Sequence, residues 1–218
     1  MRVGIREANF VFLFAGLLVL LVGVPLAEQI AGRVPMLGPL GFCVLVLVAT
    51  GTLASSGLWL RLGTGLVAAV CATSAWTLLH PGAIATAAWI SMAWAFCLLS
   101  TTICLREVLT RSRVTINHLV GAMCGYLLLA VLWAFTYAAV ELAFPGSFRA
   151  VAPDTGVALD DLLYLSLITL TTTGYGDVLP IERLARALAS LEGVVGQLYV
   201  AVLVATLVAQ YVAPGRAE

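Results

Sequence analysis

The chain has 218 residues, of which 62% are hydrophobic and only 10% are charged, whereas about a quarter of the residues in a soluble domain are charged. Eleven basic and eleven acidic residues give a formal net charge of zero, so no bulk charge favours nucleic acid as a partner. This composition argues against a soluble protein and predicts an integral membrane protein.

Six apolar runs reach the length of about 20 residues that a helix needs to cross the hydrocarbon core. The runs are Ala8–Ala27, Leu37–Leu60, Leu62–Leu79, Ile84–Leu105, Val114–Val140 and Ala187–Ala213. Only the sixth run contains a charged residue, Glu192. A cleaved signal peptide is the alternative for the first run, but 20 uncharged residues are long for such a peptide and favour a span.

A different kind of sequence lies between the fifth and sixth runs. Residues Asp160–Thr172 predict a helix of about 12 residues, with Asp160 or Asp161 as its N-cap. Such a helix rises only about 18 Å and cannot cross the membrane. It is expected to be re-entrant and to lead into irregular backbone, which is tolerated at membrane depth only inside protein or along a water-filled path. The region therefore predicts a pore or a substrate site.

The residues after this short helix are Thr172-Thr173-Gly174-Tyr175-Gly176-Asp177. They resemble the selectivity filter of potassium channels, which reads Thr-Val-Gly-Tyr-Gly-Asp in many members and replaces the hydration shell of K⁺ by carbonyl oxygens. The resemblance covers Val114–Ala213, two spanning helices and the loop between them. It implies a bacterial six-transmembrane, one-pore-loop potassium channel: an all-α membrane protein with a re-entrant pore helix and filter between helices five and six.

The residue types of the motif suit this chemistry. Gly174 and Gly176 can adopt the left-handed dihedrals that point successive carbonyls to one side. The resemblance implies that these glycines, Thr172, Thr173 and Tyr175 form the ion path, with K⁺ at Thr172 to Tyr175, and that the Thr172 hydroxyl also contributes. Tyr175 is expected to point away from the ions and brace the filter against the short helix. One loop cannot close a ring, so we predict a homotetramer.

The short helix before the motif departs from the family pattern in two ways. Many relatives have paired tryptophans on the pore helix, where this chain has Tyr164 and Leu165. Tyr164 is still expected to donate a hydrogen bond to Asp177 in support of the filter. Some relatives keep a carboxylate behind the filter, where this chain has Ile168.

The last helix carries the expected gate. Gly196 lies at the spacing of the family's bend in the inner helix, although close helix packing is the alternative. Gln197, Val200, Val204 and Val208 recur at helical spacing. They are interpreted as a stripe that faces the cavity, or alternatively as a stripe that packs against the fifth helix.

Glu192 is a functional candidate because a carboxyl group inside a membrane helix is expensive. It is expected to hydrogen-bond a pore-helix threonine such as Thr169 or Thr171, or to bias the cavity electrostatically. A protonated, purely structural side chain is the alternative.

Arginine placement predicts the orientation, since cytoplasmic loops carry an excess of basic residues. A cytoplasmic N-terminus puts seven arginines on the cytoplasmic side and four on the outside. Six spans then place both termini in the cytoplasm. We expect the protein to lie in the plasma membrane. Residues 1–113 are predicted to form four charge-poor helices and a cytoplasmic linker. Residues 114–213 are predicted to form the pore domain, and residues 214–218 a cytoplasmic tail.

The residues Leu62–Leu105 contain no Arg, Lys, Asp or Glu. Voltage-gated relatives carry Arg at every third position of the fourth helix, so we predict no intrinsic voltage sensor. Arg106, Arg111 and Arg113 follow this stretch and are assigned to the linker.

No set of side chains suggests a catalytic site, so we predict that the protein is not an enzyme and has no cofactor. K⁺ is expected only as the permeant ion. The five cysteines lack paired spacing and are expected to be buried thiols. Gly121 and Gly125 predict a small-residue packing face on the fifth helix.

The alternatives in function are a weakly selective cation channel of the same architecture and a non-conducting membrane protein that binds an ion. The expected partners are K⁺, the lipid bilayer, three further copies of the chain and an unidentified regulatory protein.

Overall fold

The computed structural model describes residues 9–31, 37–53, 57–110, 116–150 and 157–212. The predicted tail 214–218 and the linker residues Arg111 and Arg113 lie outside these ranges. The chain forms two compact units that divide within one helix, between Leu128 and Leu129. We describe each unit by itself.

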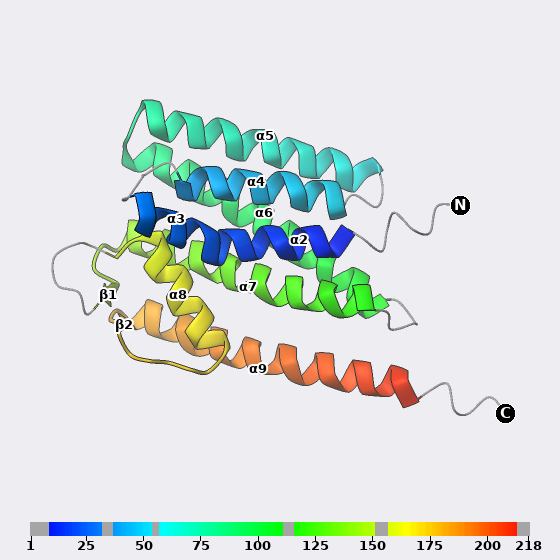
Figure 1. Cartoon of the computed structure of the whole chain (residues 1–218). Helices are drawn as coiled ribbons and strands as arrows, with labels where there is room; N and C mark the ends of the chain where they lie inside the picture. The colour runs from blue at the N-terminus through cyan, green and yellow to red at the C-terminus, as the bar shows by residue number, and fades with distance from the viewer. Residues whose placement is uncertain (1–8, 32–36, 54–56, 111–115, 151–156, 213–218) are drawn as a thin grey trace. The chain divides into compact units, whose positions relative to one another are not determined.

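The first unit consists of helices (Figure 1). The first helix runs from Asn9 to Ala31 as α2 (Asn9–Leu18), a π-helical turn η1 (Val19–Gly23) and α3 (Val24–Ala31). In the π turn the Val24 N–H bonds the Val19 carbonyl, five residues back. Pro25 follows directly and has no N–H to donate, so the normal hydrogen-bond ladder is already broken at this place.

The other helices of this unit are α4 (Leu37–Leu53), α5 (Gly57–Leu79), α6 (Ala83–Thr110) and the first part of α7 (Ile116–Ala143). α4 packs against both α2 and α5, and α5 packs against α6. Phe42 on α4 makes edge-to-face contacts with Trp89 and Phe96 on α6. All five cysteines are free thiols, as predicted, although Cys43 and Cys71 are only partly buried.

The predicted packing face of α7 is present at Gly121. A Cβ at this residue would lie 3.3 Å from the Phe10 ring of α2, so only a glycine allows this approach without displacement. The Cys104 thiol of α6 donates to the Gly121 carbonyl at 3.0 Å. The small residue therefore brings α2 and α6 close to α7.

Among the described residues, five helices are long and apolar enough to cross a membrane. Their apolar segments are Phe10–Ala27, Arg61–Leu79, Ala83–Arg106, Leu119–Ala143 and Arg183–Thr206, and the corresponding segment of α4, Pro39–Gly51, is shorter.

Two predicted boundaries were wrong. The run Leu37–Leu60 does not form one helix, because α4 ends at Leu53 and α5 begins at Gly57. The expected break at Arg61-Leu62-Gly63 lies inside α5. Arg is a good helix former and a single Gly costs only about 1 kcal/mol, so a charge ends the apolar segment without ending the helix. For the same reason α9 begins at Arg183 rather than at Ala187.

The second unit contains the rest of α7, the strand β1 (Phe148–Ala150), α8 (Leu159–Leu170), the strand β2 (Val178–Pro180) and α9 (Arg183–Val212). The strands pair antiparallel, with Phe148 opposite Pro180 and Ala150 opposite Val178. The sequence analysis predicted neither strand. This pairing ties the segment after α7 to the segment before α9.

The helix α8 has the predicted length, 12 residues, but the predicted N-cap was wrong. Ala158 is the N-cap, and both Asp160 and Asp161 lie in the first turn. The Asp161 carboxylate accepts the Ala158 N–H at 2.9 Å, which is what an acidic side chain does three residues into a helix.

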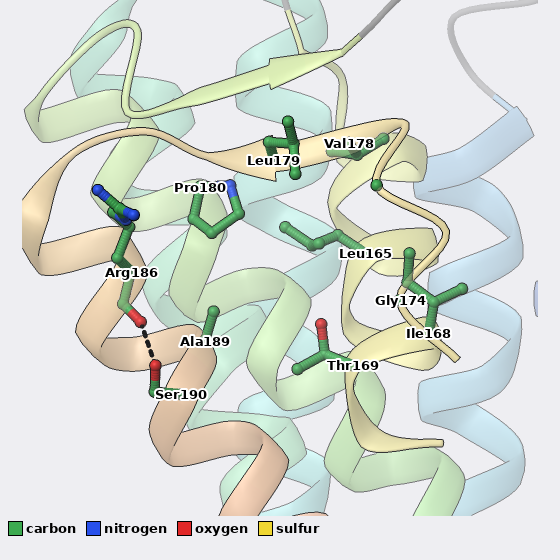
Figure 2. Close-up of a pocket in the computed structure, with 11 residues that line it drawn as sticks. Leu165, Ile168, Thr169, Gly174, Val178, Leu179, Pro180, Arg186, Ala189 and Ser190 are labelled. Carbon is green, nitrogen blue, oxygen red and sulfur yellow. Dashed lines mark hydrogen bonds between the residues drawn. The ribbon is translucent and has the colours of Figure 1, made fainter. Parts of the chain in front are cut away.

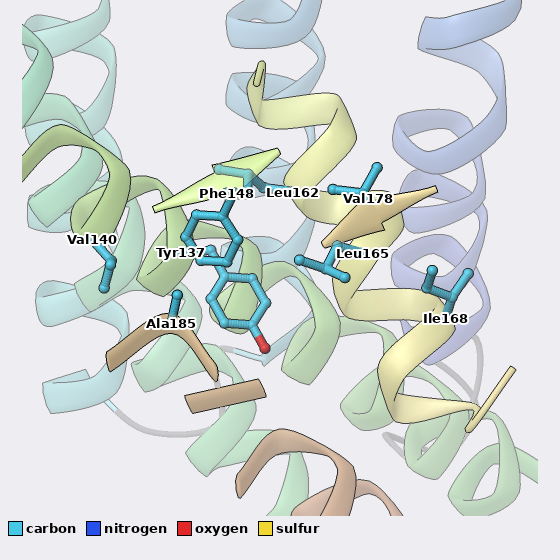
Figure 3. Packing of buried hydrophobic residues seen from close by; sticks show 8 residues of the cluster. All are labelled: Tyr137, Val140, Phe148, Leu162, Leu165, Ile168, Val178 and Ala185. Atoms are coloured by element: carbon cyan, nitrogen blue, oxygen red, sulfur yellow. The ribbon is translucent and has the colours of Figure 1, made fainter. Parts of the chain in front are cut away.

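The core of the second unit lies where α7, α8, the two strands and the start of α9 meet (Figure 3). Its buried side chains are Tyr137, Val140, Phe148, Leu162, Leu165, Ile168, Val178 and Ala185. The rings of Tyr137 and Phe148 lie 5.1 Å apart. The same buried cluster therefore contacts both α8 and the strand pair and holds them together.

The turn between α7 and β1 depends on one carboxylate. Glu141 accepts the Gly146 N–H at 2.7 Å and the Phe148 N–H at 3.0 Å. We expect Glu141→Ala to lower the free energy of unfolding by about 1–3 kcal/mol, because it leaves two amides without an acceptor. Thermal denaturation in detergent would measure this loss. Glu182→Ala, which removes an exposed carboxylate, should be near wild type, and equal melting temperatures for the two variants would contradict the prediction.

Candidate ion-binding loop

The loop begins where α8 ends at Leu170. The Ile168 carbonyl accepts two loop amides, the Thr173 N–H at 2.8 Å and the Gly174 N–H at 3.1 Å. The Thr172 N–H bonds the Thr169 carbonyl at 3.0 Å. The last carbonyls of the helix thus bind the first amides of the loop and leave the loop carbonyls available for another partner.

The backbone of the loop alternates in handedness. Thr172, Gly174 and Gly176 have φ values of 58°, 51° and 80°, while neither Thr173 nor Tyr175 is among the residues with positive φ. This alternation lets successive carbonyls point to the same side of an extended chain. Residues Thr171 to Asp177 are exposed in the single chain.

Thr172 was expected to contribute oxygens, but its left-handed backbone was not predicted. Such a conformation is unusual for a β-branched residue. Its hydroxyl donates to the Thr171 carbonyl at 2.7 Å, and the hydroxyls of Thr171 and Thr173 lie 3.0 Å apart. The three threonines therefore gather hydroxyl oxygens at the helix end of the loop.

The predicted hydrogen bond from Tyr164 to Asp177 is present, with 2.7 Å between the Tyr164 hydroxyl and Asp177 Oδ2. Asp177 Oδ1 also accepts the Val178 N–H at 3.1 Å. The bond to Asp177 raises the pKa of Tyr164 to about 12, so the phenol stays a donor at neutral pH. One carboxylate thus joins α8, the end of the loop and β2.

The position of Tyr175 differs from the expectation. Its side chain is 73% exposed, so it does not brace the loop against α8 of its own chain.

An open pocket of about 340 Å³ lies beside the loop (Figure 2). Its walls come from α8, the loop, β2 and the first turns of α9. The lining residues are Leu165, Ile168, Thr169, Gly174, Gly176, Val178, Leu179, Pro180, Arg186, Ala189 and Ser190. Leu165 and Ile168 face the loop side of this pocket, while Arg186 and Ser190 lie on the α9 side.

Glu192 is fully buried, but its partners are not the expected ones. Tyr137 on α7 donates to Oε2, and Ser166 on α8 hydrogen-bonds Oε1. The expected partners Thr169 and Thr171 lie elsewhere: Thr171 donates to the Leu167 carbonyl, and Thr169 faces Gly193. Thr169 shares a face of α8 with Ser166 but lies about one turn further along, opposite Gly193, so Ser166 and not Thr169 reaches the carboxyl group.

The residues Ser166 and Tyr137 were missed in the sequence analysis. The serine in α8 and the carboxyl group in the apolar part of α9 were two signals in the sequence. They could have been matched as partners, because buried polar groups need hydrogen bonds. Nothing in the sequence distinguished Tyr137 from the other aromatic residues of α7.

Gly196 lies against the end of α8. A Cβ at Gly196 would come within 2.8 Å of the Leu170 carbonyl oxygen and 3.1 Å of Leu170 Cα. This contact favours the packing interpretation over the hinge. Gln197, Val200 and Val204 are exposed in the single chain, and the side chain of Val208 lies outside the described residues.

Residues 123–213 match the family described as ion channel. The match includes most of α7, α8, the loop and α9, so this segment is similar to ion channels, and the apolar helices support a membrane-embedded protein.

A curated relative is the inward rectifier potassium channel Kirbac3.1 of Paramagnetospirillum magnetotacticum, which is 34% identical over 93 residues. The alignment covers 41% of this chain and only 28% of the relative. No solved structure matches the chain significantly.

The two glycines of α9 near α8 form a matched pair for a test. We expect Gly196→Ala to destabilise the protein, because the new methyl group meets backbone atoms that cannot move independently. Gly193→Ala should be neutral or stabilising by up to about 1 kcal/mol, because its Cβ would lie 4.0 Å from Thr169 and alanine favours the helix. Thermal denaturation of the two variants in detergent measures the difference. A stable Gly196→Ala protein that conducts with altered gating would support the hinge instead.

Proposed function

We propose that this protein is a potassium-selective channel, in which four copies of the loop Thr172–Gly176 surround one ion path. The observation that carries the proposal is the alternation of left-handed backbone at Thr172, Gly174 and Gly176 directly after a helix too short to span a membrane. Carbonyl oxygens of such a loop can replace the water of a cation, which would otherwise pay a large cost on entering the membrane.

The potassium assignment rests on two supports. The loop has the residues of a potassium filter, and the matched relative is by its name a potassium channel. The C-terminal end of α8 points toward the start of the loop, and its negative dipole end favours a cation there. K⁺ is thus the proposed permeant ion, and no further cofactor is proposed.

The exposed position of the loop supports the proposed tetramer. One loop offers oxygens from one side only, and its residues are exposed in the single chain. A ring of four loops related by a fourfold axis surrounds the ion and buries these residues. The exposed Tyr175, Gln197, Val200 and Val204 then lie on surfaces that other copies or the ion path would cover.

The proposed topology has six spans, with α4 as the second, and α8 re-entrant between the fifth and sixth. Both termini lie on the cytoplasmic side of the plasma membrane, as the arginine distribution favours. α4 is a shorter apolar helix than the others, and local thinning or burial against α2 and α5 accommodates it.

A flux assay in liposomes tests the function. Wild-type protein should conduct K⁺ and, under a K⁺/Na⁺ gradient, reverse near the potassium potential. We expect Gly174→Ala to reduce the flux roughly tenfold or more, because a left-handed non-glycine residue costs about 1–3 kcal/mol and 1.4 kcal/mol is a factor of ten.

Gly146→Ala is the matched control for backbone strain. Gly146 has a φ of 87° and, like Gly174, open space around its Cβ position, but it lies in the turn before β1. Its replacement should leave selectivity unchanged. Equal permeability to Na⁺ and K⁺ in wild type would favour the weakly selective channel, and no flux would favour a non-conducting ion-binding protein.

We further propose that the channel lacks an intrinsic voltage sensor, because Leu62–Leu105 carries no charged residue. Each gating charge moved across the membrane contributes about 2.3 kcal/mol per 100 mV, so steep gating needs several of them. Single-channel recordings should give an open probability that varies weakly between negative and positive voltages. A steep dependence equivalent to several charges would contradict this part of the proposal.

A further inference from the structure

The strongest feature outside the loop is the buried cluster of Glu192, Ser166, Tyr137 and the Ala130 carbonyl. Glu192 and Ser166 have no exposed surface, and Tyr137 is likewise fully buried. The cluster joins three helices, because Glu192 lies on α9, Ser166 on α8 and Tyr137 on α7. Its contacts are Tyr137 to Glu192 Oε2, Ser166 Oγ to Glu192 Oε1, and Ser166 Oγ to the Ala130 carbonyl at 2.9 Å.

The number of hydrogens decides the charge of this cluster. Its three contacts require three hydrogens, and the carbonyl oxygen of Ala130 can only accept. Tyr137 supplies one hydrogen and Ser166 supplies one. An ionised Glu192 supplies none, so Ser166 would have to face two acceptors with a single hydrogen. One contact would then join two lone pairs inside the protein, where an unmade hydrogen bond is costly.

A protonated Glu192 satisfies every contact. Its own hydrogen goes to Ser166 Oγ, the Ser166 hydrogen goes to the Ala130 carbonyl, and the Tyr137 hydrogen goes to the other oxygen of Glu192. The chain of hydrogen bonds then runs in one direction, from Tyr137 to the Ala130 carbonyl, and each of the three hydrogens has an acceptor.

The ionisable groups on the neighbouring elements do not compensate a negative charge at this place. On α7, Glu141 binds the Gly146 and Phe148 amides. On α8, Asp161 binds the Ala158 amide and Tyr164 binds Asp177. On α9, Arg186 is exposed beside the pocket. Both groups that bond the Glu192 carboxyl are neutral hydroxyls.

We propose that Glu192 is a neutral carboxylic acid that positions the pore helix α8 against α7 and α9. The cluster then holds the start of the loop in the geometry that conducts K⁺, and this last step alone rests on the proposed function. Gly196 and Leu170 are in contact one turn further along α9, so α9 meets α8 both at Ser166 and at its last residue.

Infrared spectroscopy of the reconstituted protein tests the protonation without any need for conduction. Wild-type protein labelled with ¹³C at the glutamate carboxyl groups should give a C=O stretching band of a protonated acid at neutral pH, shifted by the label. The band should vanish in Glu192→Gln and persist in Glu182→Gln, which removes an exposed glutamate. Absence of the band from wild type at neutral pH, or its persistence in Glu192→Gln, overturns the proposal.

Tyr137→Phe provides a second variant that keeps the size of the side chain. Because the Glu192 C=O oxygen then loses its donor, the band should move to higher frequency while the acid stays protonated. An unmoved band overturns the assignment of the hydrogens.

Potassium flux tests the positioning role. Glu192→Gln can donate its amide N–H to Ser166 and accept the Tyr137 hydrogen. The K⁺ flux of this variant should therefore stay within about twofold of wild type. The flux of both proteins should change little between about pH 6 and pH 8. Glu192→Leu leaves both hydroxyls without this partner, and flux should fall roughly tenfold. Equal flux in the Gln and Leu variants overturns the positioning role. No flux in wild type refutes the proposed function instead, while the infrared band still decides the protonation.

Discussion

Backbone amides and carbonyls need partners where water is excluded, and this constraint governs the end of α8 and the loop after it. The helix α8 is only 12 residues long, which is too short to span a membrane. The carbonyls of Thr169 and Ile168 take up the first loop amides. The loop carbonyls are left without amides, and a cation can be their partner because it needs oxygens as much as they need a positive charge.

Two kinds of contact hold α8 in place. Its side chains Leu162, Leu165 and Ile168 lie in the buried apolar cluster of the second unit. Polar contacts add to this packing: Tyr164 bonds Asp177 at the end of the loop, and Ser166 bonds both Glu192 and the Ala130 carbonyl. Close approach of Gly196 to Leu170 adds a third point of contact. The loop, α7, α8 and α9 are thus joined by hydrogen bonds and close packing.

The first unit is of a different kind. Its helices join through apolar and small residues, as at Gly121 against Phe10 and at the rings of Phe42, Trp89 and Phe96. Hydroxyls on these helices mostly return to their own backbone, as Ser74 does to the Val70 carbonyl. The stretch Leu62–Leu105 of these helices has no charged side chain that a membrane field could move, which agrees with the proposal that the channel lacks an intrinsic voltage sensor.

The sequence by itself determined the membrane class and the short helix, because both follow from composition and from neighbours along the chain. The loop motif and the Tyr164–Asp177 hydrogen bond were predicted from the resemblance to potassium channels. Only the tertiary structure decided that the partners of Glu192 are Ser166 and Tyr137, and that residues 148–150 pair with residues 178–180. The physical reason is distance along the chain. Tyr137 and Glu192 are 55 residues apart, and no local pattern specifies which faces of three apolar helices will meet.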